Sequence, residues 1–312
     1  MKRILPLILC VVLLASCSGA VDENKKHERT LFSMDTQIDM TVYGKNGEEA
    51  LDKAEEEIKR INEKYGITTL DKTVLSPDEE TKALVARAQE IKESTNGAFD
   101  ISVAPIMRIW GFYSSEFGEK SHRVPSNDEI AEALSAAEQG IYLDLGAMAK
   151  GYCADKVVEI LKEEGIESAV ISLGGNVAVV GSNYDGQPWT VGIQSPFDES
   201  IYATVKASDK MIVTSGDYMR YFEQNGRRYH HIINPKTGYP ADNDLTSVTV
   251  IADNGAYADA ISTALFVMGK DKAIEYWKNH KGFEMILITK DGKIYCTQGV
   301  DIQTKNEINI IK

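Results

Sequence analysis

The chain has 312 residues and a formal net charge of −13, from 34 basic and 47 acidic side chains. A protein this acidic repels nucleic acid and anionic lipid, so the composition excludes a nucleic-acid-binding protein. Phosphorylated ligands are repelled as well, so any phosphate chemistry needs a local cation, most simply a metal ion.

Residues 1–16 are typical of a lipoprotein signal peptide. Lys2-Arg3 precede an apolar run from Ile4 to Leu14, and Leu14-Ala15-Ser16-Cys17 matches the bacterial lipobox. The run is too short for a permanent membrane-spanning helix. We therefore expect lipidation of Cys17 with acyl chains such as palmitate, which anchors the protein to the extracytoplasmic side of the cell membrane. Residues 17–30 are expected to form a polar tether, and loss of the leader lowers the net charge to −15. A secreted protein with a chance cysteine is the alternative.

The rest of the chain, residues 31–312, contains no Pro/Ser-rich linker or repeat and predicts a mixed α/β architecture with mostly meandering strands. The expected strands are 37–43, 168–173, 176–180, 189–194, 201–206, 210–214 and 246–251, with hairpin turns at Asn225-Gly226 and Asp291-Gly292. The expected helices are 48–64, 77–94, 149–164, 256–268, 270–280, and one to about residue 138 behind a capping box at Ser126–Glu129. Cys153 and Cys296 lack the spacing of a disulfide framework and are expected to be buried thiols.

The segment Leu143–Asp155 combines a carboxylate, a turn of small residues and Lys150 where a strand is expected to pass into a helix. Exposed N–H groups at a helix start favour anions, and a nearby lysine adds positive charge. The segment therefore offers a place for a phosphate group. It fits neither common phosphate-loop pattern, so an ordinary structural turn explains it equally well.

A second segment, Tyr257–Thr263, opens a helix that is otherwise small and apolar. Asp259 and Thr263 are four residues apart and so share one helix face, with Ser262 beside them. Carboxylate and hydroxyl oxygens suit Mg²⁺, which takes few protein ligands and completes its shell with water and substrate oxygens. Taken alone, the segment favours the simpler alternative, in which Asp259 complements the helix dipole and Thr263 bonds back to a carbonyl.

Three further turns can border a ligand. Ser172–Asn176 contains paired glycines that let a flat ligand approach the backbone, although such pairs often mark only a tight bend. The turn at 213–218 is rich in hydroxyl groups. His230 and His231 are expected to face opposite ways on a strand, so we do not expect them to bind one metal. We expect one of them to be exposed and the other to line a pocket with Ile233.

Together these segments resemble the ApbE-type family, the FAD:protein FMN transferases of bacterial envelopes. The resemblance covers nearly the whole chain after its leader and implies one large domain related to the T-fold. The family is commonly lipid-anchored, in agreement with Cys17. Several motifs in the right order carry the resemblance: Met34-Asp35-Thr36, Gly97-Ala98-Phe99-Asp100-Ile101-Ser102, Ile109-Trp110-Gly111-Phe112, Leu143–Asp155, Leu173-Gly174-Gly175, Thr214-Ser215-Gly216, His231–Gly238 and Ala258–Thr263.

The resemblance also implies a set of site residues. Mg²⁺ would be bound by the side chains of Asp259 and Thr263 and the carbonyl of Ala147, with Ser262 adjacent. Asp259, Lys150 and His231 would be the catalytic residues. The contacts to FAD would fall on Met34, Ala98, Phe99, Asp100, Asp144, Lys150 and Ile233.

The implied reaction cleaves the pyrophosphate of FAD, passes FMN to a threonine or serine hydroxyl of an envelope flavoprotein, and releases AMP. The acceptor would be an ion-pumping or electron-transfer flavoprotein. An FAD pyrophosphatase, in which water replaces the acceptor hydroxyl, is the first alternative, and a non-catalytic FAD-binding lipoprotein is the second. The second is disfavoured because holding a flavin needs no metal. A generic solute-binding lipoprotein would show two similar lobes, which this chain does not predict.

One departure from the family pattern follows the first long helix. Family members usually carry a Leu-Ser-x-Tyr stretch before the Gly-Ala-Phe-Asp segment. Here Glu57–Asn62 continues the charged helix and that stretch is missing. In relatives this stretch would help to cover the flavin. We therefore do not predict such a cover for this chain.

Overall fold

The computed structural model describes residues 25–66, 77–113, 122–140 and 142–312. The predicted signal peptide, Cys17 and the tether as far as residue 24 lie outside these residues, as does the segment 67–76 that follows the first helix. Within the described part of the chain, none of the helices is long and apolar enough to cross a membrane.

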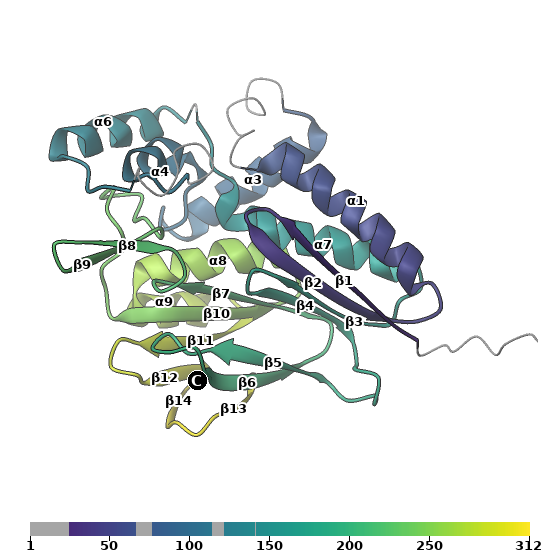
Figure 1. The fold of residues 1–312 in the computed structure, drawn as a ribbon. Coiled ribbons are helices and arrows are strands. Elements are labelled where there is room, and N and C mark those ends of the chain that lie inside the picture. The colour runs from purple at the N-terminus through teal and green to yellow at the C-terminus, as the bar shows by residue number, and fades with distance from the viewer. Residues whose placement is uncertain (1–24, 67–76, 114–121, 141) are drawn as a thin grey trace, which may run out of the picture.

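The centre of the fold is a sheet whose nine described strands follow one another mostly in chain order (Figure 1). All neighbouring strands are antiparallel except the last pair, so the expected meandering α/β architecture is confirmed. In spatial order the strands are β1 (Lys26–Ser33), β2 (Thr36–Tyr43), β3 (Ser168–Leu173), β4 (Asn176–Gly181), β7 (Lys210–Gly216), β10 (Leu245–Ala252), β11 (Phe283–Thr289), β12 (Ile294–Thr297) and β14 (Ile308–Ile311).

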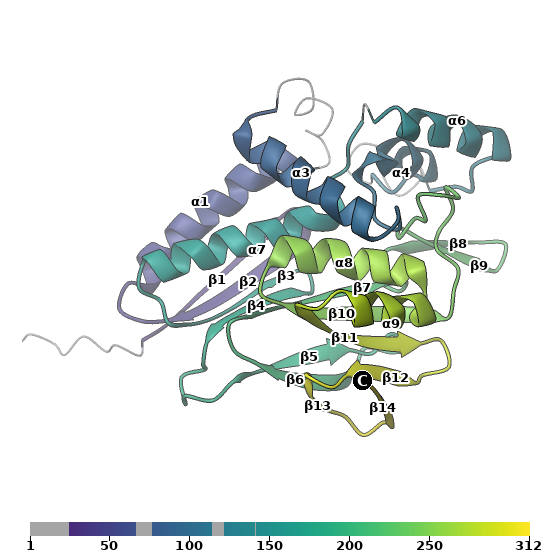
Figure 2. The same ribbon diagram turned by 180° about the vertical axis from the view of Figure 1, so that it is seen from behind.

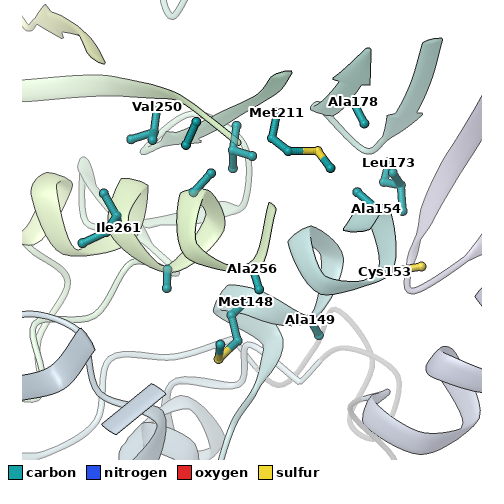
Figure 3. Packing of buried hydrophobic residues seen from close by; sticks show 14 of the residues in the cluster. Met148, Ala149, Cys153, Ala154, Leu173, Ala178, Met211, Val250, Ala256 and Ile261 are labelled. Carbon is teal, nitrogen blue, oxygen red and sulfur yellow. The ribbon is translucent and has the colours of Figure 1, made fainter. Parts of the chain in front are cut away.

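Helices cover one face of this sheet (Figure 2). They are α1 (Gly47–Tyr65), α3 (Glu79–Ser94), α7 (Gly146–Glu163), α8 (Gly255–Met268) and α9 (Lys270–Asn279). Helix α8 is buried nearly all round, which explains its small and apolar sequence. Figure 3 shows α7 and α8 packed beneath the strands that carry Met211 and Val250, with Ala154 of α7 beside Leu173 of β3 and Met148 pointing away from the sheet.

The other face of the sheet packs against a small second sheet of β5 (Trp189–Gln194), β6 (Ile201–Ala207) and β13 (Asp301–Gln303). A separate apolar cluster joins the two sheets and includes Ile212 and Ile286 from the large one and Val191 and Val205 from the small one. Because both faces of the central strands are covered, these strands are buried on both sides.

A third apolar cluster surrounds Trp110, whose indole N–H donates to the carbonyl of Gly238 at 2.8 Å. It joins the 3-10 turn η1 (Ile101–Val103), α4 (Ala104–Trp110), α6 (Asn127–Glu138) and the hairpin of β8 (Tyr221–Gln224) and β9 (Arg227–His230). The hairpin turns at Asn225-Gly226 as predicted, with both residues at positive φ. The capping box at Ser126–Glu129 is also confirmed.

The structure differs from the sequence-based expectations at several boundaries. Residues 26–30, assigned to the tether, belong to β1, and the domain therefore begins before residue 31. Helix α7 begins at Gly146 rather than residue 149, and residues 142–145 before it are irregular rather than a strand. Helix α4 and strands β13 and β14 were not predicted. Cys153 and Cys296 are buried free thiols, as expected.

Candidate functional site

A pocket of about 370 Å³ lies between the helices and the end of the sheet where β2, β4 and β7 meet their turns. Most of the residues singled out from the sequence line it, although they come from segments far apart in the chain. These lining residues are Met34, Ala98, Phe99, Asp100, Asp144, Ala147, Lys150, His231, Ile233, Asp259 and Thr263.

The roof of the pocket depends on a very close crossing of α7 and α8. A Cβ added at Gly151 would lie 2.0 Å from the carbonyl oxygen of Gly255, and one added at Gly255 would lie 2.4 Å from that of Gly151. The N–H of Gly151 donates to Oδ2 of Asp259 at 2.9 Å. In an α-helix the same N–H faces the carbonyl four residues earlier, here that of Ala147. The crossing therefore brings the Asp259 carboxylate beside the Ala147 carbonyl.

The side chains of α8 divide between the pocket and the sheet. Asp259 is 5% exposed and lies in the second turn of the helix, beyond the first turn where a carboxylate best complements the helix dipole. Ser262 is not among the described lining residues, because its hydroxyl bonds to the carbonyl of Asp259 at 2.9 Å and to Oγ of Ser215 at 2.8 Å. Thr263 Oγ1 has only long contacts of 3.4 Å to the Asp259 carbonyl and to Ser215. Thr263 is therefore better placed than Ser262 to meet a ligand.

The oxygen atoms at this crossing suit a magnesium ion. Asp259 supplies one carboxylate, Thr263 a hydroxyl and Ala147 a carbonyl, all hard ligands that leave further positions for water or substrate oxygens. Elsewhere in the described part of the chain, no group of three or more His, Cys, Asp or Glu side chains is arranged to hold a metal. The site thus offers a mixed set of oxygen donors with a single formal negative charge.

Two carboxylates at the site are already engaged by the protein. Asp144 accepts the N–H of Gly146 at 2.7 Å on one oxygen and the hydroxyl of Tyr113 at 3.0 Å on the other. Asp100 accepts the N–H of Ser102 at 2.9 Å and pairs with Lys92 at 2.7 Å. Both side chains therefore fix the turns in which they lie, and the Asp144 bond explains why α7 starts three residues early.

The pocket contains two cations, of which the sequence analysis found one. Lys150 lines the pocket from the second turn of α7 and makes no hydrogen bond or ion pair with any residue that the structure describes. Arg220, which the sequence analysis missed, also lines it and donates to the carbonyl of Phe112 at 2.6 Å. Arg220 follows β7 in an irregular segment without a motif, so its place was not predictable. Asp35, Asp100, Asp144 and Asp259 also line the pocket, so these two cations balance only part of its negative charge.

His231 is held as a neutral imidazole. The carbonyl of Arg220 lies 3.1 Å from its Nδ1 and can only accept, so Nδ1 carries the proton and Nε2 keeps its lone pair. Burial, followed by the charge of Arg220, lowers the pKa of His231 to about 3. His230 is buried rather than exposed, which corrects the prediction for this pair, and its Nε2 lies 2.9 Å from the carbonyl of Ala241.

The floor of the pocket is formed by two tight hairpin turns. Met34 and Asp35 join β1 to β2 with φ of 53° and 58°, and Gly174 and Gly175 join β3 to β4 with φ of 58° and 98°. A left-handed conformation is strained for residues other than glycine, but Met34 is held by its N–H bond to Oδ1 of Asn62 at 3.0 Å. Met34, Asp35, Thr36 and Gly174 line the pocket, so the first turn contributes residues with side chains and the second contributes bare backbone.

An apolar wall completes the pocket. It can bury one face of a flat aromatic ring, which is how most ligand pockets gain affinity, while the charged groups fix orientation. The wall consists of Phe99, Val103, Met107, Phe112, Met219, Ile232, Ile233 and Pro235.

Comparisons with known proteins find relatives along most of the chain. The model of the ApbE family matches residues 34–287. The FAD:protein FMN transferase of Haemophilus influenzae is 31% identical over 296 residues, covering 88% of this chain and 81% of the relative. That of Escherichia coli K12 is 34% identical over 251 residues, covering 73% and 70%.

Solved structures agree with these relatives. The ApbE protein of Thermotoga maritima has a TM-score of 0.77 at 32% identity and covers 86% of this chain and 96% of its own. The flavin transferase ApbE of Vibrio cholerae has a TM-score of 0.74 at 26% identity and covers 88% and 97%.

Proposed function

This chain belongs to the ApbE family, and from that membership we propose that it is a Mg²⁺-dependent FAD:protein FMN transferase. It would move FMN from FAD to a threonine or serine hydroxyl of an acceptor protein and release AMP. The observation that carries the proposal is the convergence in one pocket of an apolar wall, two cations and the oxygen donors of Asp259, Thr263 and Ala147.

The residues of the pocket match the needs of this reaction. The acceptor oxygen forms a bond to the phosphorus of the FMN half, and the bond from that phosphorus to the bridging oxygen breaks, so that AMP leaves. Bound Mg²⁺ would supply further neutralisation of the pyrophosphate. Lys150 and Arg220 offset negative charge on the same group. The lone pair on Nε2 of His231 can accept a hydrogen bond from the attacking hydroxyl and orient it, while the proton that the hydroxyl loses passes to water.

We further propose that Cys17 is lipidated and holds the domain at the extracytoplasmic face of the cell membrane, where its acceptor would be an ion-pumping or electron-transfer flavoprotein. The lipobox Leu14-Ala15-Ser16-Cys17 supports this anchor.

Incubation with FAD and Mg²⁺ tests the function. With a protein that carries a flavinylation site, we expect release of AMP and a mass gain of the acceptor equal to bound FMN. Without an acceptor, free FMN together with AMP would indicate the pyrophosphatase activity that the same site permits. Binding of FAD without either product, with and without acceptors, would favour flavin storage instead.

Replacement of Lys150 by alanine is expected to lower kcat by about a hundredfold while changing the Kd of FAD much less. The reason is that its ammonium group, which has no partner among the described residues, is available for charge that develops as the bond breaks. Lys156→Ala is the matched control, because Lys156 lies on the same helix but pairs with Glu159 at 2.6 Å. If FAD affinity falls and kcat does not, Lys150 is only a binding residue.

Between pH 8 and pH 5, we expect no loss of kcat that is caused by protonation of His231. Its pKa of about 3 keeps the imidazole neutral throughout this range, so the lone pair on Nε2 can accept a hydrogen bond from the acceptor hydroxyl at every pH in it. His231→Ala should lower kcat about a hundredfold at each pH, whereas His280→Asn, at the end of α9, should not. If kcat falls with an apparent pKa near 6.5, and this fall is absent in His231→Ala, then His231 is not a neutral imidazole in this pH range.

A further inference from the structure

Asn176, the first residue of β4, has an unusual place in the pocket. Its side chain lines the pocket while the residue is only 3% exposed. Its Nδ2 is buried, and no described residue accepts a hydrogen bond from it. The glycine-rich turn before it is visible in the sequence, but nothing in the sequence indicates a role for the amide.

A buried donor without an acceptor destabilises the folded state, and native proteins contain few of them. The other buried side-chain atoms without partners in the described part of the chain belong to His27, Ser168 and Ser247. None of these three residues is among the described lining of the pocket. Asn176 therefore differs from them, because a ligand in the pocket can supply the acceptor that the protein does not.

The surroundings of Asn176 indicate which part of a ligand it meets. Alternation along β4 turns Asn176, Ala178 and Val180 to the helix-covered face of the sheet. The adjoining residues Gly174 and Gly175 have no side chains, and a Cβ at Gly175 would lie 3.4 Å from the methyl group of Met219. The amide thus lies next to the bare backbone of this turn, which lets a flat ring approach it closely.

The absence of charge on the Asn176 amide also favours contact with the ring of a ligand over contact with its phosphates. An amide N–H is neutral, whereas a phosphate is best met by the cations Lys150 and Arg220, which come from other elements. A neutral carbonyl oxygen or ring nitrogen is the matching acceptor for a neutral amide.

We propose that the side-chain amide of Asn176 donates a hydrogen bond to a carbonyl oxygen or ring nitrogen of the isoalloxazine ring and so positions the flavin. This inference rests on the proposed function, because it takes the ligand to be a flavin. It makes Asn176 a binding residue that acts on riboflavin, FMN and FAD alike.

The test compares Asn176→Leu, which keeps the volume and removes the polar group, with Asn176→Asp, which keeps the shape and removes the N–H donors. Riboflavin, FMN and FAD are titrated by flavin fluorescence with a chelator present, so that no turnover occurs. We expect the Kd of all three flavins to rise by about tenfold in both variants. The Tm of the flavin-free protein should rise in Asn176→Leu, because an unpaired buried donor has been removed. If the leucine variant does not fold, Asn176→Asp alone decides the affinities.

Ser168→Ala is the matched control, because it removes a buried and unpartnered hydroxyl from β3 outside the described lining of the pocket. We expect it to leave flavin affinity unchanged. If the parent binds all three flavins and the Asn176 variants bind them equally well, the inference fails while the proposed function stands. A loss confined to FMN and FAD would place the acceptor on phosphate and also overturn it. If the parent binds no flavin at all, the proposed function itself fails.

Discussion

Replacement of Asp259 by asparagine is expected to leave the protein folded and to reduce Mg²⁺-dependent FAD cleavage by at least about a thousandfold. Asp259 is the only charged member of the oxygen set formed with Thr263 and the Ala147 carbonyl, so its loss removes the main attraction for a divalent ion. The amide oxygen of asparagine can still accept the N–H of Gly151, which Asp259 now does at 2.9 Å. The helix crossing should therefore survive the substitution.

The measurement is AMP release from FAD at a series of Mg²⁺ concentrations, with Tm as the check on folding. Asp253→Asn is the control for charge, since Asp253 is exposed two residues before α8 and pairs with Lys210 on the surface. We expect the control to keep the parent rate. Asp259→Ala is expected to be equally inactive and also less stable by about 1–3 kcal/mol, because it leaves the buried N–H of Gly151 without its carboxylate acceptor.

A folded Asp259→Asn variant that releases AMP at close to the parent rate would refute the metal assignment. The flavin-storage alternative would then have to be weighed again, together with other catalytic arrangements.

Replacement of Gly151 by alanine is expected to destabilise the fold by about 2–4 kcal/mol and to remove most of the activity of the molecules that remain folded. The added Cβ would lie 2.0 Å from the carbonyl oxygen of Gly255 and 2.8 Å from Cβ of Asp259. Neither contact can be relieved by rotating a flexible side chain, so α7 and α8 must separate. Separation of the helices moves Asp259 away from Ala147, so the oxygens of Asp259, Thr263 and Ala147 no longer lie close enough together to bind one metal ion.

Chemical denaturation gives the stability of this variant, and Mg²⁺-dependent turnover below its unfolding range gives the activity. Gly186→Ala is the control, because a Cβ there meets nothing within 4 Å and only its φ of 74° is strained. That change should cost about 1 kcal/mol and leave turnover intact. Parent-like stability of Gly151→Ala would show that the two helices can shift without loss.

The elements that the sequence predicts best are those whose local pattern and long-range packing agree. Strand β3 alternates in burial along its whole length, and α8 is apolar because it is covered on nearly every side. Strand β1 shows the opposite case. Its residues are charged enough to resemble a tether, but Arg29 pairs with Glu48, Asp52 and Glu55 of α1, which lie far ahead in the sequence. Charge patterning alone does not reveal such a partner.

The candidate site shows the same limit. The spacing of Asp259 and Thr263 places them on one helix face, but the donor that holds Asp259 is the N–H of Gly151, 108 residues earlier. No motif predicts that Arg220 enters the pocket, because its position follows from the packing of an irregular segment. Local periodicity predicts which residues share a face, whereas the groups that meet across the pocket depend on the complete fold.

The side chain and the main chain of Arg220 make different contacts in the site. Its guanidinium group donates to the carbonyl of Phe112 at 2.6 Å, whereas its own main-chain carbonyl accepts hydrogen bonds from the backbone N–H of His231 at 3.0 Å and from the ring Nδ1–H at 3.1 Å. The tautomer of His231 is thus set by an atom that every amino acid possesses. A redesign that exchanges the Arg220 side chain for a differently charged substrate would lose the bond to Phe112 but keep the main-chain carbonyl that holds the proton of the imidazole on Nδ1.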